Sequence, residues 1–175
     1  NKRITNMAEL RGLKVRVQGA PIWSRTFQAA GMSPSVIAYN EVYNGIQNNV
    51  IEAGENEAAG VEAMRFFEVA PNLIMTEHAI TIRPICFASQ TLARLPPALQ
   101  EAVKRAGREA AAFGREAEST EDGQKIAALE SAGRLRRVVF NDRAALKRAV
   151  DPVMEAYAKE VGAESIFTRI NALTS

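Results

Sequence analysis

Cysteine and long apolar runs are scarce in this sequence, and each scarcity excludes a class of structure. Cys86 is the only cysteine, so the chain cannot hold an internal disulfide. No apolar run approaches the ~20 residues that a membrane-spanning helix requires. Internal repeats and low-complexity segments are lacking as well. With 47% hydrophobic and 24% charged residues, the composition is instead that of an ordinary globular protein with one good core or two small ones.

The sequence also lacks an excess of charge of one sign. Its 22 basic and 20 acidic residues are interspersed throughout and leave a formal net charge of +2. A protein that binds nucleic acid usually carries a basic stripe with interleaved aromatic residues, and no such stripe is present. We therefore expect no nucleic-acid partner.

Residues for covalent or metal chemistry are few. His78 and Cys86 are the sole residues of their types, and a cysteine–histidine pair can perform nucleophilic chemistry. They lie eight positions apart in one predicted extended segment, which in a straight strand separates them by ~26 Å. No metal-ligand cluster, nucleophile elbow or phosphate-binding loop is found elsewhere. We expect a protein that is not an enzyme and has no metal or cofactor, with His78 structural and Cys86 in the core.

The first third of the chain alternates strand and helix patterns. The order is a strand (13–17), a helix (21–31), a second strand (35–39), a helix (41–48) for which Asn40 is the expected cap, and a third apolar run (50–53). This is a βαβαβ unit, and such α/β units bind ligands at the carboxyl ends of their strands. Arg16, Tyr39 and Asn56 lie at or just past three such ends, which predicts a site there.

The rest of the chain is mostly helical. A helix follows Asn56 and ends at Pro71, and an extended segment then runs from 73 to 88. A long helix is expected from Pro97 to Gly133, followed by a strand at 136–140 and a helix that ends at Gly162. Within that last helix, Asp151 and Pro152 fit either a continuation or a fresh start.

Several motifs occur in order and at consistent spacing over nearly the whole chain. They resemble those of the solute-binding proteins of tripartite ATP-independent periplasmic (TRAP) transporters, the DctP-like family. The matching pieces are Glu9–Val17 (family-like "DLKGLKIRV"), Glu41-Val42-Tyr43 with Ile46-Gln47 ("EVYxALQ"), Val50–Asn56 ("VVDGQEN"), His78, and Leu95-Pro96 with Leu99-Gln100. Two departures bear on the identity of the ligand: Glu52-Ala53-Gly54 replaces the usual "DG", and Gln18-Gly19-Ala20 replaces the more common residues after the first strand.

The resemblance implies a fold class and an arrangement of domains. Family members are longer and have two α/β lobes that close on a ligand, so we expect one periplasmic-binding-protein-like lobe with long C-terminal helices and the N-terminal lobe largely missing. Residues 1–81 and 122–175 would form the second lobe, and residues 82–121 would belong to the first. Because the chain begins without methionine or an apolar signal core, we expect that a leader has been removed or that the chain comes from something larger. The implied location is periplasmic.

The resemblance also implies roles for named residues. Arg16 occupies the position of an arginine that makes a two-pronged salt bridge to the substrate carboxylate, and a planar guanidinium suits that role. Asn56 aligns with an asparagine that hydrogen-bonds the same carboxylate, and Tyr39 with an aromatic that packs on the ligand. Glu55 is expected to accept hydrogen bonds from ligand hydroxyls, and Arg83 to reach the cleft from the crossing segment. Each has a structural alternative: a surface ion pair for Arg16, a helix cap for Asn56, and solvated side chains for the other three.

Two functions follow from these patterns. The first is capture of a small organic acid, a uronate, aldonate or dicarboxylate, for delivery to the membrane permease subunits of a transporter. The second is an isolated α/β interaction module that dimerises through exposed apolar residues in 82–121 and binds no small ligand. Besides the permease, the expected macromolecular partner is either a second copy of the chain, in a homodimer, or a complementing N-terminal fragment.

Overall fold

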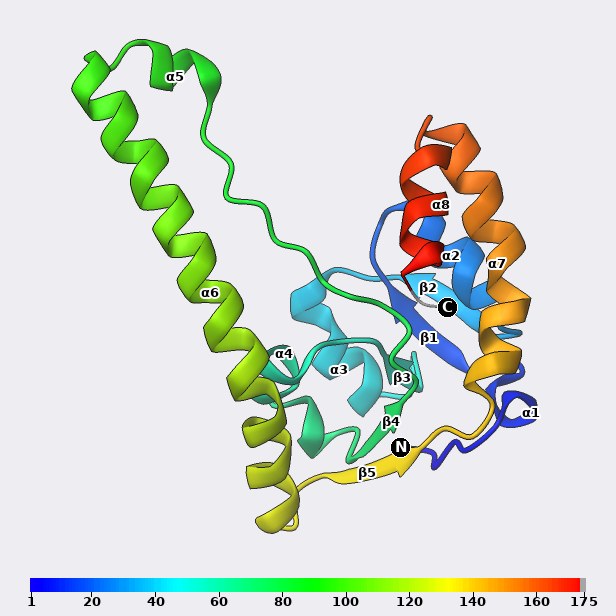
Figure 1. Cartoon of the computed structure of the whole chain (residues 1–175). Coiled ribbons are helices and arrows are strands. Elements are labelled where there is room, and N and C mark those ends of the chain that lie inside the picture. The colour runs from blue at the N-terminus through cyan, green and yellow to red at the C-terminus, as the bar shows by residue number, and fades with distance from the viewer. Residues whose placement is uncertain (174–175) are drawn as a thin grey trace.

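The computed structural model describes residues 1–173 as two small parallel sheets with helices on both sides (Figure 1). The helices are α1 (Met7–Leu10), α2 (Pro21–Ala29), α3 (Val42–Gln47), α4 (Ala58–Ala63), α5 (Ser89–Ala93), α6 (Pro97–Ser131), α7 (Arg143–Glu160) and α8 (Glu164–Ala172), with 3-10 turns η1 (Tyr39–Glu41) and η2 (Phe66–Glu68). The strands are β1 (Lys14–Val17), β2 (Ser33–Val36), β3 (Ala53–Gly54), β4 (Asn72–Met75) and β5 (Arg136–Val139). The α/β class expected from the sequence is therefore confirmed.

The first sheet has the order β2-β1-β3, with all strands parallel. Its central strand β1 is buried from Val15 to Val17 because helices cover the sheet, as is usual for parallel sheets. In register with Arg16 lie two small residues, Ser35 of β2 and Gly54 of β3. The second sheet pairs β4 with β5, also in parallel. These pairings direct the carboxyl ends of β1, β2 and β3 to the same edge.

Helix α2 begins at Pro21, whose fixed φ and missing N–H suit the first turn of a helix. It packs on β1 through Phe27, which contacts Val15 and Val17 in one buried cluster. The helix ends before Gly31, which has a φ of +86° that L-residues rarely adopt. The chain can therefore turn back at once into β2.

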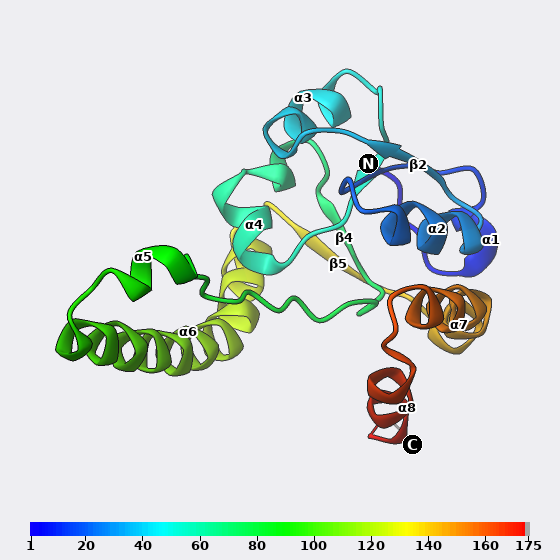
Figure 2. The same cartoon turned by 90° about the horizontal axis from the view of Figure 1, so that it is seen from above.

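Helix α6, with the short helix α5 at its N-terminal end, forms an extended arm. Only its C-terminal part packs on the body, where Leu129 and Ile126 meet Val61 and Phe67. In Figures 1 and 2 the rest of α6 and α5 project to one side of the sheets, whereas α7 and α8 lie on the other. The arm and the irregular segment 76–88 expose large apolar side chains: Ile80, Ile82, Ile85, Phe87, Leu99 and Phe113. No helix in residues 1–173 is long and apolar enough to cross a membrane.

Four boundaries in the first half differ from the sequence-based prediction. The third strand, predicted from the apolar run 50–53, is β3 at Ala53–Gly54, because only these two residues pair with β1. The second strand was predicted at 35–39 but is β2 (33–36), because the turn at Gly31 starts it earlier and leaves Tyr39 in η1. Asn40 does not cap α3, whose N-cap is Glu41 without a side-chain hydrogen bond. The predicted helix up to Pro71 is broken at Arg65, which has a left-handed φ of 53° and separates α4 from η2.

The second half also differs in places. The predicted extended segment 73–88 is regular only in β4, because β5 offers hydrogen-bond partners for four residues. Cys86 was expected in the core but is exposed on this irregular segment. Pro152 lies inside α7, so the helix continues through it. Helices α1 and α8 were not predicted.

Candidate ligand-binding site

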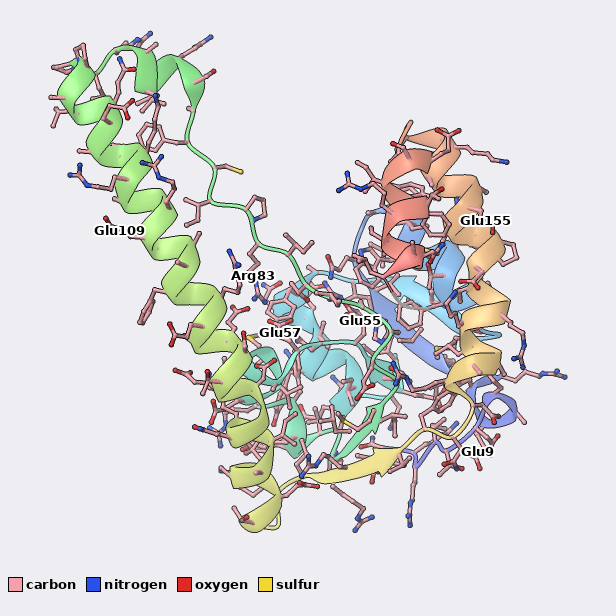
Figure 3. All side chains as sticks on the ribbon, viewed as in Figure 1. Glu9, Glu55, Glu57, Arg83, Glu109 and Glu155 are labelled. Carbon is pink, nitrogen blue, oxygen red and sulfur yellow. The ribbon has the colours of Figure 1, made fainter. Side chains whose placement is uncertain are left out.

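A pocket of about 700 Å³ lies at the carboxyl ends of β1, β2 and β3. Residues that directly follow these strands line it, and segment 79–83 passes along it on the side of the arm. All five residues predicted from the sequence line this one pocket: Arg16, Tyr39, Glu55, Asn56 and Arg83. Figure 3 shows Glu55, Glu57 and Arg83 between α6 and the sheets.

Arg16 is the one charged residue among residues 1–173 that is buried, with 7% of its surface exposed. Its Nε donates a hydrogen bond to the carbonyl oxygen of Ile37 at 2.9 Å, which fixes the direction of the side chain. The guanidinium carbon lies 5.5 Å from the centre of the Tyr39 ring. Within residues 1–173, no carboxylate pairs with Arg16 and its terminal nitrogens have no hydrogen-bond partner. The surface ion pair considered from the sequence is therefore not formed.

Asn56 and Tyr39 are joined to each other beside Arg16. The Nδ2 of Asn56 donates a hydrogen bond to the Tyr39 hydroxyl at 3.0 Å, and its Oδ1 accepts one from the backbone N–H of Glu57, also at 3.0 Å. The Tyr39 ring packs edge-on against Phe66 at 5.9 Å. Asn56 is not the helix cap considered from the sequence, because the N-cap of α4 is Glu57 and no side chain caps it. The Asn56 amide still has a second N–H available. The tyrosine hydroxyl is bonded to a side chain rather than left to solvent.

Both carboxylate oxygens of Glu55 have a polar neighbour, and its side chain is only 13% exposed. Gln18 donates from Nε2 to Oε1 at 3.2 Å, and Nε2 of His78 lies 3.9 Å from Oε2. Gln18 was not among the predicted site residues. Its position after β1 was a usable signal, since it lies two residues beyond Arg16 and strand residues spaced by two share a face.

Arg83 lines the pocket but is already paired. Its guanidinium forms ion pairs with Glu57, at the start of α4, and with Glu118 of α6, the latter at 2.7 Å. These contacts attach segment 79–83 to both the body and the arm. Glu57 also lines the pocket, and the sequence-based prediction did not include it.

His78 packs against two aromatic side chains, and 24% of its own side chain stays exposed. Its ring meets Phe27 at 5.4 Å and Trp23 at 6.4 Å, both edge-on, and Nδ1 lies 2.8 Å from the Thr76 hydroxyl. Desolvation lowers the pKa of His78 below its usual 6.5, and Glu55 opposes part of this shift. His78 is therefore neutral at pH 7. Its expected structural role fits these contacts.

The lowered pKa of His78 predicts how stability changes with pH. Below pH ~6.5 the unfolded chain binds a proton at this histidine while the folded chain does not, so the free energy of unfolding falls as pH decreases. The fall ends once pH drops below the folded pKa. Urea denaturation between pH 8 and pH 5 should show this loss in the wild type and a smaller one in His78→Gln. Identical pH profiles for the two proteins would contradict the assignment.

The arrangement is suited to binding an organic anion. It presents one fixed cation with unpaired donors, an adjacent amide and an aromatic ring. Among residues 1–173 there is no group of three or more histidine, cysteine or acidic side chains that could hold a metal ion. His78 and Cys86 do not form a dyad, since the imidazole faces Glu55 and Thr76 while Cys86 is exposed on the segment toward the arm.

Comparison with known proteins identifies the family. Residues 1–160 match the model of the family DctP, described as bacterial extracellular solute-binding protein, family 7. The chain belongs to this family. The resemblance to TRAP solute-binding proteins drawn from the sequence motifs is thereby confirmed. One relative, named a solute-binding protein of Sulfitobacter sp. NAS-14.1, is 47% identical over 97% of this chain and 51% of its own length.

Solved structures of the family have the same fold. A TRAP periplasmic solute-binding protein from Sulfitobacter sp. NAS-14.1, with bound α-D-taluronate, is 47% identical with a TM-score of 0.93, covering 97% of this chain and 55% of that one. One from Roseobacter denitrificans, with bound β-D-glucuronate, is 30% identical with a TM-score of 0.84, covering 91% and 52%. The chain thus spans about half the length of the family members it matches.

Proposed function

We propose that this chain is the C-terminal half of a periplasmic solute-binding protein that captures an organic acid by its carboxylate, with Arg16 as the anchor. The observation that carries the proposal is the buried, unpaired guanidinium of Arg16 at the pocket. The terminal nitrogens of Arg16 are not among the buried, unpartnered polar atoms of the described residues, so these unpaired donors open on the pocket and an anion can reach them. A carboxylate matches the paired donors of a guanidinium with two parallel hydrogen bonds.

Asn56 and Tyr39 complete the anchor in this proposal. The second N–H of Asn56 reaches the same carboxylate, and the Tyr39 ring packs against the body of the ligand. Glu55 and Gln18 supply acceptors and donors for ligand hydroxyls. Because Arg83 is neutralised by Glu57 and Glu118, we assign it the role of holding segment 79–83 beside the ligand.

A uronate is the acid we favour. Two relatives at 47% and 30% identity were solved with taluronate and glucuronate bound. A relative of Escherichia coli, named for 2,3-diketo-L-gulonate binding, is 31% identical over 77% of this chain and 43% of its own length. A hydroxylated acid also uses the polar groups around Glu55, for which a plain dicarboxylate has fewer partners.

The test is isothermal titration of the chain with D-glucuronate and D-galacturonate, and with D-glucose as the matched neutral control. We expect the uronates to bind and glucose not to bind, because only the uronates present a carboxylate to Arg16. Succinate and an aldonate distinguish the alternatives within the acid class. Binding of glucose as tight as that of glucuronate would refute carboxylate capture.

We further propose that residues 82–121 belong to a first lobe, while residues 1–81 and 122–175 form the second. Support comes from the exposed apolar side chains of this stretch, such as Ile82 at 84% and Phe113 at 74%, which a partner surface would cover. The competing reading is a homodimer through the same surface that binds no small ligand. Light scattering of the chain with and without uronate separates them, since a dimer indifferent to uronates supports the interaction module.

In this scheme the protein acts in the periplasm without catalysing a reaction and without a cofactor. Closure of the two lobes would enclose the acid, and the closed complex would dock on the membrane permease subunits of the transporter. The naming of the relatives as solute-binding proteins supports a transport role over an enzymatic one.

A further inference from the structure

Gly60 of α4 occupies a position where any side chain would collide with the proposed ligand-binding asparagine. A Cβ built on Gly60 would lie 2.3 Å from Oδ1, 2.7 Å from Cγ and 2.8 Å from Nδ2 of Asn56. These distances are far shorter than a van der Waals contact, so the Asn56 carboxamide rests directly against the bare Cα of Gly60. Gly60 is buried, which leaves the carboxamide no space to one side.

Backbone conformation does not explain this glycine. The glycines with a positive φ are Gly12, Gly31, Gly133 and Gly162, and Gly60 is not among them. Its helical φ is one that alanine adopts more favourably than glycine. Glycine is therefore required here because the Asn56 carboxamide occupies the place where a Cβ would lie.

The contact between Gly60 and Asn56 connects this glycine to Arg16, the proposed anchor. The carboxamide held by Gly60 donates to the Tyr39 hydroxyl at 3.0 Å, and the Tyr39 ring lies over the guanidinium of Arg16. We propose that Gly60 is a positioning residue of the carboxylate site: its missing side chain sets the place of the Asn56 carboxamide and, through Tyr39, the surroundings of Arg16. This inference deepens the proposed function and rests on it.

The test replaces Gly60 by alanine in the 175-residue chain and uses D-glucuronate as the probe. The atoms that a Cβ would meet form the free end of a side chain, so Asn56 can rotate away while the helix remains intact. We expect the fold to be retained with a melting temperature close to that of the wild type, because the better helix propensity of alanine offsets the lost hydrogen bonds of Asn56 to Tyr39 and Glu57. We also expect a roughly ten- to hundredfold loss of affinity, the effect of one hydrogen bond to a charged group. The matched control is Gly123→Ala in α6, a helical glycine with nothing within 4 Å of its Cβ position, which should leave affinity unchanged.

Two further readouts separate positioning from a general structural effect. Gly60→Ala should add little to the loss caused by Asn56→Ala, because both remove the same carboxamide from the site. A crystal structure of Gly60→Ala should show Asn56 detached from Tyr39. Wild-type affinity in Gly60→Ala alongside lost affinity in Asn56→Ala would overturn the inference and leave the proposed function standing. If the wild type binds no uronate, the proposed function itself fails. An Asn56 carboxamide that has not moved in the crystal structure of Gly60→Ala would refute the positioning role alone.

Discussion

Arg16→Ala is expected to weaken uronate binding by about a hundredfold or more, equivalent to ~3 kcal/mol or more. The guanidinium is buried, aligned by Ile37 and free of any carboxylate in the described part of the chain, so its donors remain available to a ligand. Removing them leaves the ligand carboxylate desolvated without a counter-charge. Isothermal titration with D-glucuronate measures the loss directly.

Two variants sharpen the experiment. Arg16→Lys keeps the charge but replaces a planar fork by a point charge, so we expect it to recover only part of the affinity. Arg16→Met keeps much of the apolar stem that packs beneath Tyr39, and should match Arg16→Ala in binding while folding as well as the wild type. Full affinity in Arg16→Lys would show that charge alone, and not paired hydrogen bonds, holds the acid.

Ile51→Ala is expected to lower the free energy of unfolding by about 2–5 kcal/mol. Ile51 is 0% exposed and packs with Val42, Ile46 and Phe66 in one buried cluster. Its side chain also lies 3.2 Å from the Cβ position of Gly45, so the backbone of α3 closes directly over it. Truncation opens a cavity that this close packing cannot fill by small shifts.

Urea denaturation followed by circular dichroism measures the change, with Ile51→Val as the graded control at about 0.5–1.5 kcal/mol. Since Phe66 of this cluster supports the Tyr39 ring, the variant should also lose some affinity for uronate, though less than Arg16→Ala. A loss of stability in Ile51→Ala no larger than that in Ile51→Val would mean that the cluster repacks freely.

The strand-end residues were predictable because parallel topology alone brings them together. Arg16, Tyr39 and Asn56 each follow or end a segment with a clear pattern, and they line one pocket even though β2 begins two residues earlier than predicted. An error in a strand boundary displaces a side chain along the strand, but it does not move the loop to another edge of the sheet. Glu55 directly follows β3 and belongs to the same strand end, whereas Arg83 was predicted from the segment that crosses between the lobes and not from a strand end.

Other features depend on contacts between residues distant in sequence and give no local signal. The ion pairs of Arg83 require the arm to lie beside α4, and the burial of the His78 ring requires α2 to pack over it. Gly60 has an ordinary helical conformation, so its importance is visible only from the atoms of Asn56. The exposed position of Cys86 also follows from the path of an irregular segment and not from its apolar neighbours.

The departures Glu52 and Ala53 from the family motif now have a local explanation. Glu52 pairs with Lys2 at 2.6 Å and accepts a hydrogen bond from the backbone N–H of Lys14, and neither Glu52 nor Ala53 lines the pocket around Arg16. They therefore bear on the attachment of the N-terminal residues to the sheet more than on the choice of ligand.

The placement of Arg16 in the central strand has a consequence for how this site can change over evolution. Its neighbours in register, Ser35 and Gly54, are strand residues, whereas Tyr39, Glu55 and segment 79–83 lie in connections. Connections tolerate substitution and changes of length far better than central strands do. In the proposed binding mode the acid is recognised from the sheet and the remaining contacts lie in loops, so we expect that the loops can change and one acid replace another while the fold and the anchor are kept.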